Sequence, residues 1–282
     1  METFILEHEP LLRMGAFVAV FGLMALWEIA APMHTPKISR TLRWPSNFGI
    51  TVLNIALVRV VFPASAVGMA LYAQSHGLGL FNIVQVPYPV ALLGAVLLLD
   101  LVIYFQHRVF HTVPLLWRLH RMHHADPAFD VSTATRFHPI EIFLSMLVKF
   151  AAILVIGPPA LGVFLFELLL NLTATFNHAN VRMPVGIDRV LRFFLVTPDM
   201  HRIHHSVIGH EHNSNFGFCL SIWDRLLGTY KAEPIGGQRA IRIGLLEISD
   251  VKVNTRFIGL LSIPFLSARP QKPNAENVLH TP

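Results

Sequence analysis

Three histidine clusters with helical spacing constrain this chain more than any other feature of its sequence. His107 and His111 form an HxxxH pair, and two later segments, LHRMHH at 119–124 and MHRIHH at 200–205, each carry an HxxHH pattern. Because positions i, i+3 and i+4 are neighbours on a helix surface, each cluster places its imidazoles on one helical face. Imidazole is the commonest side-chain metal ligand near neutral pH, so the sequence predicts a metal site assembled from three helical segments.

The number of these histidines favours two metal ions over one. A first-row metal accepts roughly four to six ligands, whereas the three clusters supply eight histidines. A histidine considered alone is usually a surface residue or a satisfied core residue, but that interpretation does not account for three clusters at helical spacing. We therefore predict a dinuclear, histidine-rich centre.

The composition is that of a membrane protein. Of the 282 residues, 53% are hydrophobic and only 14% are charged, with a mean hydropathy of +0.53, whereas soluble domains carry about 25% charged residues. The formal net charge of +5 comes from short Lys and Arg groups beside apolar runs, which indicates anchoring to anionic lipid and no nucleic-acid partner. Cys219 is the only cysteine, which excludes an internal disulfide and a cysteine-based zinc motif.

Apolar runs predict three membrane spans followed by a helical hairpin. We expect the spans at about 11–33, 50–72 and 86–105, since about twenty apolar residues cross a bilayer. Two shorter runs, 142–156 and 161–176, flank Gly157-Pro158-Pro159. This helix-breaking tip predicts that the two runs enter and leave the bilayer by the same face.

The distribution of Lys and Arg predicts the topology. Short loops rich in these residues stay on the cytoplasmic side, and the loop at 34–46 carries Lys37, Arg40 and Arg43, with Trp44 as an interfacial anchor. The loop at 75–86 has neither Lys nor Arg and is expected outside. The histidine clusters therefore belong on the cytoplasmic side of a multi-pass membrane protein.

The two ends of the chain lie outside these spans. The first ten residues include three glutamates and no basic residue, so no cleavable signal peptide is expected. We expect the short apolar segment 256–266 to form a surface or interfacial helix, and the residues beyond Arg269 to form a frayed tail.

The ordered motifs of the chain resemble the fatty acid hydroxylase and sterol desaturase superfamily of integral-membrane, histidine-rich di-iron oxygenases. The resemblance covers about 95–232 and rests on DLVIYFQHRVFH, LHRMHH, FHPIE, NHAN, MHRIHH and NSNFGFCLSIWDRLLGTY, which follow in the family's order. It implies an all-α fold of about four to five membrane-embedded helices with a cytosolic helical cap that carries a dinuclear metal site. We divide this single domain into membrane helices at 1–94, a catalytic region at 95–232 and a cytosolic C-terminal tail at 233–282.

The resemblance also implies which residues form the site. The family's metal ligands correspond to His107, His111, His120, His123, His124, His201, His204 and His205, with His178 of the NHAN motif as a ninth. Additional candidates are His138, His210 and His212.

Three polar residues are candidates for orienting the ligand rings. Asp100 and Tyr104 precede His107 by seven and three residues, which places them on the same helical face. We expect the Asp100 carboxylate to accept a hydrogen bond from a ligand histidine or from Arg108. Asn177 is the third candidate, since it directly precedes His178.

The function implied by the resemblance is hydroxylation of a lipid or sterol C–H bond. Such bonds are unreactive, so the site needs a redox metal that activates O2, which zinc alone cannot do. We therefore expect two iron ions, with zinc as a replacement in purified protein, and O2 as co-substrate. Electrons would come from a separate donor such as a cytochrome b5-like protein, a ferredoxin or a reductase, and the substrate from the bilayer.

Three alternatives remain open at this point. A desaturase would use the same site and remove two hydrogens from the lipid or sterol. A histidine-rich membrane metal transporter is a different class, but its site would be expected near the bilayer midplane, whereas the clusters follow the spans. A membrane cytochrome with two axial histidines would leave most of the clustered histidines unexplained.

Overall fold

The computed structural model describes residues 1–84 and 86–267, and this part of the chain is helical, with three isolated β-bridges and no strand. The predicted all-α class is confirmed. The predicted tail beyond Arg269 lies outside the described residues. Five segments of the described chain are long and apolar enough to cross a membrane: Glu9–Ala30, Arg40–Ile83, Tyr88–Thr112, Pro139–Ile156 and Ala160–Asn177.

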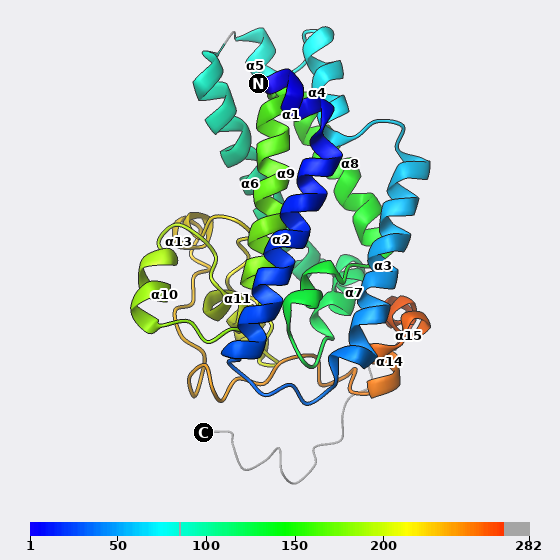
Figure 1. Cartoon of the computed structure of the whole chain (residues 1–282), viewed down its shortest axis with the longest axis vertical. Helices are drawn as coiled ribbons and strands as arrows, with labels where there is room; N and C mark the ends of the chain where they lie inside the picture. The colour runs from blue at the N-terminus through cyan, green and yellow to red at the C-terminus, as the bar shows by residue number, and fades with distance from the viewer. Residues whose placement is uncertain (85, 268–282) are drawn as a thin grey trace.

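The long helices form a bundle, and the shorter ones form a cap at one end of it (Figure 1). The bundle contains α1 (Glu2–Glu7), α2 (Glu9–Ala30), α3 (Arg40–Val61), α4 (Ala66–Ser75), α5 (Leu80–Ile83), α6 (Tyr88–Thr112), α8 (Pro139–Ile156) and α9 (Ala160–Asn177). The cap contains α7 (Pro114–His124), η1 (Val131–Thr135), α10 (Val185–Leu191), α11 (Pro198–His204), α12 (Gly209–His212), α13 (Ile222–Leu226), α14 (Val251–Thr255), α15 (Phe257–Ser262) and η2 (Ile263–Phe265). The N-terminus lies at the end of the bundle away from the cap (Figure 1).

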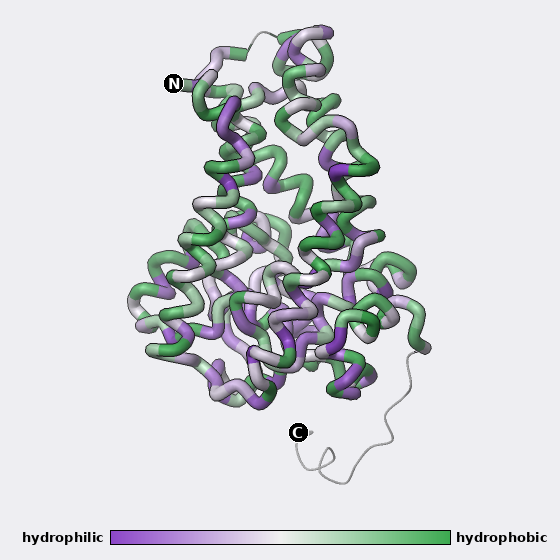
Figure 2. Tube along the Cα trace, turned by 45° about the vertical axis from the view of Figure 1, so that its right-hand side comes forward, coloured by the Kyte–Doolittle hydropathy of each residue, from purple (hydrophilic) through white to green (hydrophobic). Residues whose placement is uncertain are grey.

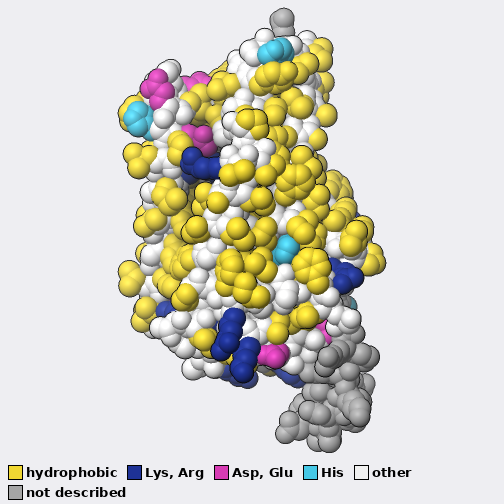
Figure 3. Space-filling model, turned by 90° about the vertical axis from the view of Figure 1, so that its right-hand side faces the viewer, with side chains coloured by type: hydrophobic (Ala, Val, Ile, Leu, Met, Phe, Trp, Pro, Cys, Tyr) yellow, Lys and Arg dark blue, Asp and Glu magenta, His cyan; other side chains and the backbone are white. Residues whose placement is uncertain are grey.

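Polarity divides along the same axis. The bundle is mostly hydrophobic, whereas hydrophilic residues gather in the cap (Figure 2). On the face shown in Figure 3, hydrophobic side chains cover the bundle, and most of the Lys and Arg side chains lie at the cap end. A surface with this distribution suits a bundle in lipid and a cap in water.

Local signals explain where the bundle helices begin and end. Pro139 occupies the first turn of α8, a position that needs no backbone donor. The helix ends at Gly157, which adopts a φ of +65° that other residues rarely adopt. Pro158 and Pro159 then prevent continuation, and α9 begins at Ala160. The predicted turn between the two hairpin helices is therefore present, and it returns His178 to the cap end.

The second span differs from its prediction. Helix α3 begins at Arg40 instead of near residue 50, and it ends at Val61 before a break that precedes α4. The cause is a set of polar partners: Arg43 is fully buried and binds Asp126 at 2.5 Å and Asp130 at 2.7 Å. The Trp44 indole also donates to Asp130, at 3.0 Å. Arg43 therefore joins α3 to the cap.

The third span is longer than predicted and carries the first histidine pair. Helix α6 continues through Thr112 instead of ending near residue 105, so His107 and His111 belong to its last two turns. Helix α7 then begins at Pro114. The predicted surface helix at 256–266 corresponds to α15 and η2, in which Ile258 is 71% exposed while Leu260 is fully buried.

A partly buried ion-pair network joins α2 to the α8–α9 hairpin. Arg13 binds Glu9 at 2.8 Å and Glu167 at 2.6 Å, and the Lys149 ammonium binds Glu167 at 2.5 Å. Charges within membrane helices are costly unless they are paired, and here each charge has a partner. Sequence patterns did not indicate this network, because its members are single residues within apolar runs.

Candidate metal centre

The nine histidines predicted as ligands lie together where the bundle meets the cap, and they form two groups. In each group, one nitrogen of every ring lies within 4.8 Å of the others. All nine side chains are buried. The first group contains His107, His111, His120, His124 and His204, and the second contains His123, His178, His201 and His205.

The HxxHH spacing divides each motif between the groups. In α7, His120 and His124 are one turn apart and face the first group, whereas His123 faces the second. In the MHRIHH segment the division is reversed, since His201 and His205 face the second group and His204 faces the first. Helices α7 and α11 therefore each contribute to both groups.

The first group contains two nitrogen lone pairs that face each other. His107 donates from Nδ1 to the Phe216 carbonyl oxygen at 2.7 Å, so its Nε2 carries no proton. His120 uses Nδ1 to donate to the Glu141 carboxylate at 2.7 Å, which leaves its Nε2 bare as well. These two Nε2 atoms are 3.1 Å apart. Two lone pairs at this distance repel each other unless a cation accepts both, so the donor set fits a metal ion.

The second group has the same property around His178. Its Nδ1 donates to the Ala174 carbonyl oxygen at 2.7 Å. Its bare Nε2 lies 3.0 Å from Nε2 of His123 and 3.0 Å from Nε2 of His201. A bare ring nitrogen has one lone pair and accepts one hydrogen bond, so the Nε2 atom of His178 cannot satisfy both neighbours by hydrogen bonding. A cation that binds the three Nε2 atoms would satisfy them all.

Several other ring nitrogens are buried and lack a hydrogen-bond partner within the described chain. They include both nitrogens of His111 and of His205, and Nε2 of His124 and of His204. Buried polar atoms are nearly always satisfied, and leaving one unpaired costs about 1–3 kcal/mol. These nitrogens belong to the two groups, so the donor set fits one cation in each group.

Burial keeps the cap histidines in the form that binds metal. It lowers the pKa of His120 and of His178 to about 3, because an imidazolium would lose its hydration in these buried places. Burial and neighbouring histidines lower the pKa of His123, His201 and His205 well below 6.5. These rings are therefore neutral at pH 7, as metal ligation requires.

Acceptors outside the two groups fix the orientation of the rings. His107 and His204 donate to the carbonyl oxygens of Phe216 and Ser214, at 2.7 and 2.8 Å. Glu141, in the first turn of α8, is the one side-chain acceptor among these bonds in the described chain. Sequence reasoning missed its role, although Glu141 closes the FHPIE motif; the signal was a carboxylate three residues after His138.

Within the described chain, the side chains of Asp100, Tyr104 and Asn177 form no hydrogen bond with any of the nine histidines. Asp100 accepts from Leu220 N at 3.1 Å and from the Trp223 indole at 2.8 Å. The expectation that it accepts from a ligand histidine or from Arg108 is therefore wrong, because the 219–223 backbone lies closer. All three residues instead bind the segment 216–230, which supplies the acceptor for His107. Tyr104 bonds the Thr229 hydroxyl at 2.7 Å, and Asn177 donates to the Phe218 carbonyl at 3.0 Å.

Asp224 holds the same segment and was not predicted. Its carboxylate accepts from Phe216 N at 2.7 Å, from Gly217 N at 2.9 Å and from the Thr229 hydroxyl at 2.7 Å. Burial raises the pKa of Asp224 to about 6. Asp224 thereby fixes the backbone that presents the Phe216 carbonyl to His107.

The three additional histidines lie outside both groups. His138 is buried and caps α8, where its Nδ1 accepts from Ile140 N at 3.2 Å. His210 is exposed. His212 is half-buried and stacks on Trp117, with ring centroids 4.9 Å apart, and its ring lies 5.5 Å from that of His111. His212 therefore borders the first group without joining it.

Comparisons with known proteins support the same region. Residues 92–229 match the family model for fatty acid hydroxylase. The chain is 34% identical to the ornithine lipid hydroxylase OlsE of Rhizobium tropici, over 58% of this chain and 46% of that protein. It is 33% identical to the alkylglycerol monooxygenase of Homo sapiens, over 50% of this chain and 30% of that protein.

A third relative matches over a longer stretch. The chain is 25% identical to the fatty acid hydroxylase vlmA of Lecanicillium sp, over 76% of this chain and 61% of that protein. The chain thus spans less than two thirds of each of these three relatives. No solved structure matches it significantly.

Proposed function

We propose that this chain, whose residues 92–229 match the family model for fatty acid hydroxylase, is a membrane-bound monooxygenase that hydroxylates a lipid C–H bond. One observation carries the proposal: nine buried histidines form two groups in which bare ring nitrogens face each other. We assign the predicted metal ligands to these nine residues. We also propose that 1–282 works as one domain, with membrane helices at 1–94, a catalytic region at 95–232 and a C-terminal part at 233–282.

Two iron ions are the cofactor that this donor set favours. Imidazole binds iron, copper, nickel and zinc, but oxidation of a C–H bond requires accessible redox states, which zinc lacks. When bound, the irons would supply the two-electron activation of O2 that inserts one oxygen atom into the substrate. His120 and His178, held by Glu141 and the Ala174 carbonyl, would keep the ligand geometry fixed.

The substrate is proposed to be a lipid taken directly from the bilayer. The histidine groups lie where α6 and α9 leave the bundle, so a chain that enters between membrane helices reaches them without crossing water. The relatives are named for an ornithine lipid, an alkylglycerol and a fatty acid. These names share a long acyl or alkyl chain, which supports a lipid chain as the site of oxidation.

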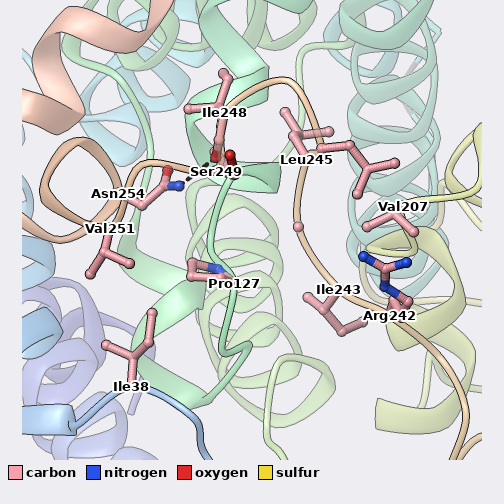
Figure 4. A pocket seen from close by; sticks show the side chains of 13 residues that line it. Ile38, Pro127, Val207, Arg242, Ile243, Leu245, Ile248, Ser249, Val251 and Asn254 are labelled. Carbon is pink, nitrogen blue, oxygen red and sulfur yellow. Dashed lines mark hydrogen bonds between the residues drawn. The ribbon is translucent and has the colours of Figure 1, made fainter. Parts of the chain in front are cut away.

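Electrons are proposed to come from a separate protein that docks on the cytosolic face of the cap. Positive charge gathers there (Figure 3), and Lys and Arg exceed Asp and Glu in the chain by 22 to 17. The segment 242–249 borders a pocket of about 330 Å³, in which Arg242 lies beside Val207 on one side and Val251 and Asn254 on the other (Figure 4). The Gly244 N–H of this segment donates a hydrogen bond to the His205 carbonyl oxygen at 3.3 Å. This segment would therefore lie between a docked electron-transfer protein and His205 of the second group.

A paired histidine substitution tests the proposed function. His204→Ala removes a ligand of the first group, whereas His210→Ala removes an exposed histidine outside both groups. We expect His204→Ala to insert in the membrane, to lose bound iron and to abolish hydroxylation, while His210→Ala keeps all three properties. In the unmodified protein, label from 18O2 should enter the product. Full activity of His204→Ala, or label that enters only from water, would exclude the proposal.

A further inference from the structure

A second pocket lies beside the cap end of the first membrane span, apart from the pocket of Figure 4. It encloses about 580 Å³, and Met33, three residues beyond the end of α2, forms part of its wall. The other walls come from the 182–192 segment that contains α10, from Asp199 and from the loop 233–239. None of the nine histidines of the metal centre lines it.

Hydrogen bonds attach two walls of this pocket to the end of the first span. Arg182 N donates to the Ala31 carbonyl at 2.8 Å, and Asn180 binds the His34 backbone with both side-chain atoms, at 3.0 and 2.7 Å. The His34 ring also bonds the Gln238 carbonyl at 2.8 Å. Arg182 and the residue after Gln238, Arg239, are thus held at the level where the chain leaves the membrane.

The buried charged side chains that line the pocket form ion pairs, whereas its exposed charged side chains do not. Asp188 pairs with Arg192, and Asp199 pairs with Arg202 behind the wall at 2.6 Å. Three charged lining residues remain: Arg182, Arg239 and Glu233, all exposed. Within residues 1–84 and 86–267, none of these three has an oppositely charged group within 4.0 Å. The pocket therefore presents two free guanidinium groups and one free carboxylate.

The surface next to the pocket is apolar and faces outward. On α10, Val185 is 70% exposed, Ile187 52% and Val190 61%, and Phe193 and Phe194 follow at 59% and 68%. Figure 1 shows α10 at the edge of the cap, to one side of the lower ends of α2 and α9. A short helix with an exposed apolar face and arginines beside it suits the boundary between hydrocarbon and head groups. This position favours a membrane lipid over a water-soluble ligand.

We propose that this pocket binds the head group of a bilayer phospholipid that carries both a phosphate and an ammonium group. Arg182 and Arg239 bind the phosphate, since guanidinium groups match its oxygens in geometry and charge. Glu233 binds the ammonium group. The acyl chains leave the pocket over Met33 and Val185 into the hydrocarbon beside α10. The site holds a lipid at the cap independently of the oxygenase chemistry.

Lipid binding to the purified, delipidated chain tests this proposal. Native mass spectrometry in detergent would compare phosphatidylethanolamine, phosphatidylglycerol, diacylglycerol and glycerol 3-phosphate. We expect one phosphatidylethanolamine to bind most tightly, phosphatidylglycerol more weakly, and diacylglycerol not at all. The double variant Arg182→Gln/Arg239→Gln should weaken phosphatidylethanolamine binding by roughly tenfold or more, and Glu233→Gln should remove the preference over phosphatidylglycerol.

The matched control is Lys252→Gln/Arg256→Gln, which removes two exposed positive charges at α14, away from this pocket. It should leave lipid binding unchanged. Retained iron content and thermal unfolding temperature would show that each variant folds. The proposal is overturned if the Arg182/Arg239 variant binds lipid like the unmodified chain, if the control loses binding equally, if diacylglycerol binds as well as the phospholipid, or if glycerol 3-phosphate binds as tightly as the lipid.

Discussion

Glu141 offers the sharpest test of how the first histidine group would hold the proposed metal. Its carboxylate accepts the Nδ1 proton of His120 at 2.7 Å in a buried place. Loss of a group that orients a metal-binding histidine typically weakens metal affinity by roughly 10–100-fold. We expect Glu141→Leu to weaken iron binding in the first group by this factor. Glu141→Gln keeps an oxygen acceptor and should weaken it by roughly threefold to tenfold.

The effect should be confined to one of the two ions. His120 belongs to the first group only, and the second group orients His178 through a backbone carbonyl that Glu141 does not touch. Titration with a chelator, followed by iron analysis, should therefore show one ion lost early and one retained. Glu7→Gln, an exposed carboxylate at the far end of the bundle, is the control. Equal loss of both ions, or unchanged affinity in folded Glu141→Leu, would refute the reasoning.

Three further predictions concern folding and topology. Arg43→Met should destabilise the chain by about 3–5 kcal/mol because it removes the nearest cation of the buried carboxylates Asp126 and Asp130. Denaturant unfolding in detergent measures this, and a loss below about 1 kcal/mol would contradict it. Burial raises the pKa of Asp224 to about 6, so its ionisation costs stability above pH 6 and this cost disappears as pH falls toward 4. The stability of the unmodified chain relative to Asp224→Asn should rise by about 2–3 kcal/mol from pH 7 to pH 4, and a pH-independent difference would show that the carboxyl does not titrate as stated. A reporter fused after Pro282 should be cytoplasmic, and a signal from the opposite side of the membrane would invert the proposed orientation.

The sequence was sufficient for features that repeat at a fixed spacing. The apolar runs predicted the bundle helices, and HxxxH and HxxHH identified eight of the nine histidines that the structure brings together. The ninth, His178, was indicated only by the family's NHAN motif. The predicted helix ends were less accurate where contacts between distant segments determine where a helix begins or ends. Helix α3 starts ten residues early because Arg43 finds Asp126 and Asp130, about 85 residues later in the chain. No local pattern connects residues so far apart, so hydropathy assigned the start of α3 to a loop.

The residues that orient the ligands were harder to predict for a similar reason. Asp100 and Tyr104 do lie on the helical face of His107, as their spacing indicates. Their partners, however, come from 216–230, more than a hundred residues away. Helical spacing predicts neighbours on one helix, but it contains no information about which distant segment packs against that face.

The division of each HxxHH motif explains why two groups form and not one larger cluster. Residues i and i+4 lie almost above one another on a helix, while i+3 is rotated to the other side of that line. Thus His123 diverges from His120 and His124, and His204 diverges from His201 and His205. Because α7 and α11 each carry ligands for both groups, the separation of the two sites is fixed by the width of a helix face. A substitution that rotates either helix would therefore disturb both groups, whereas loss of Glu141 should disturb one.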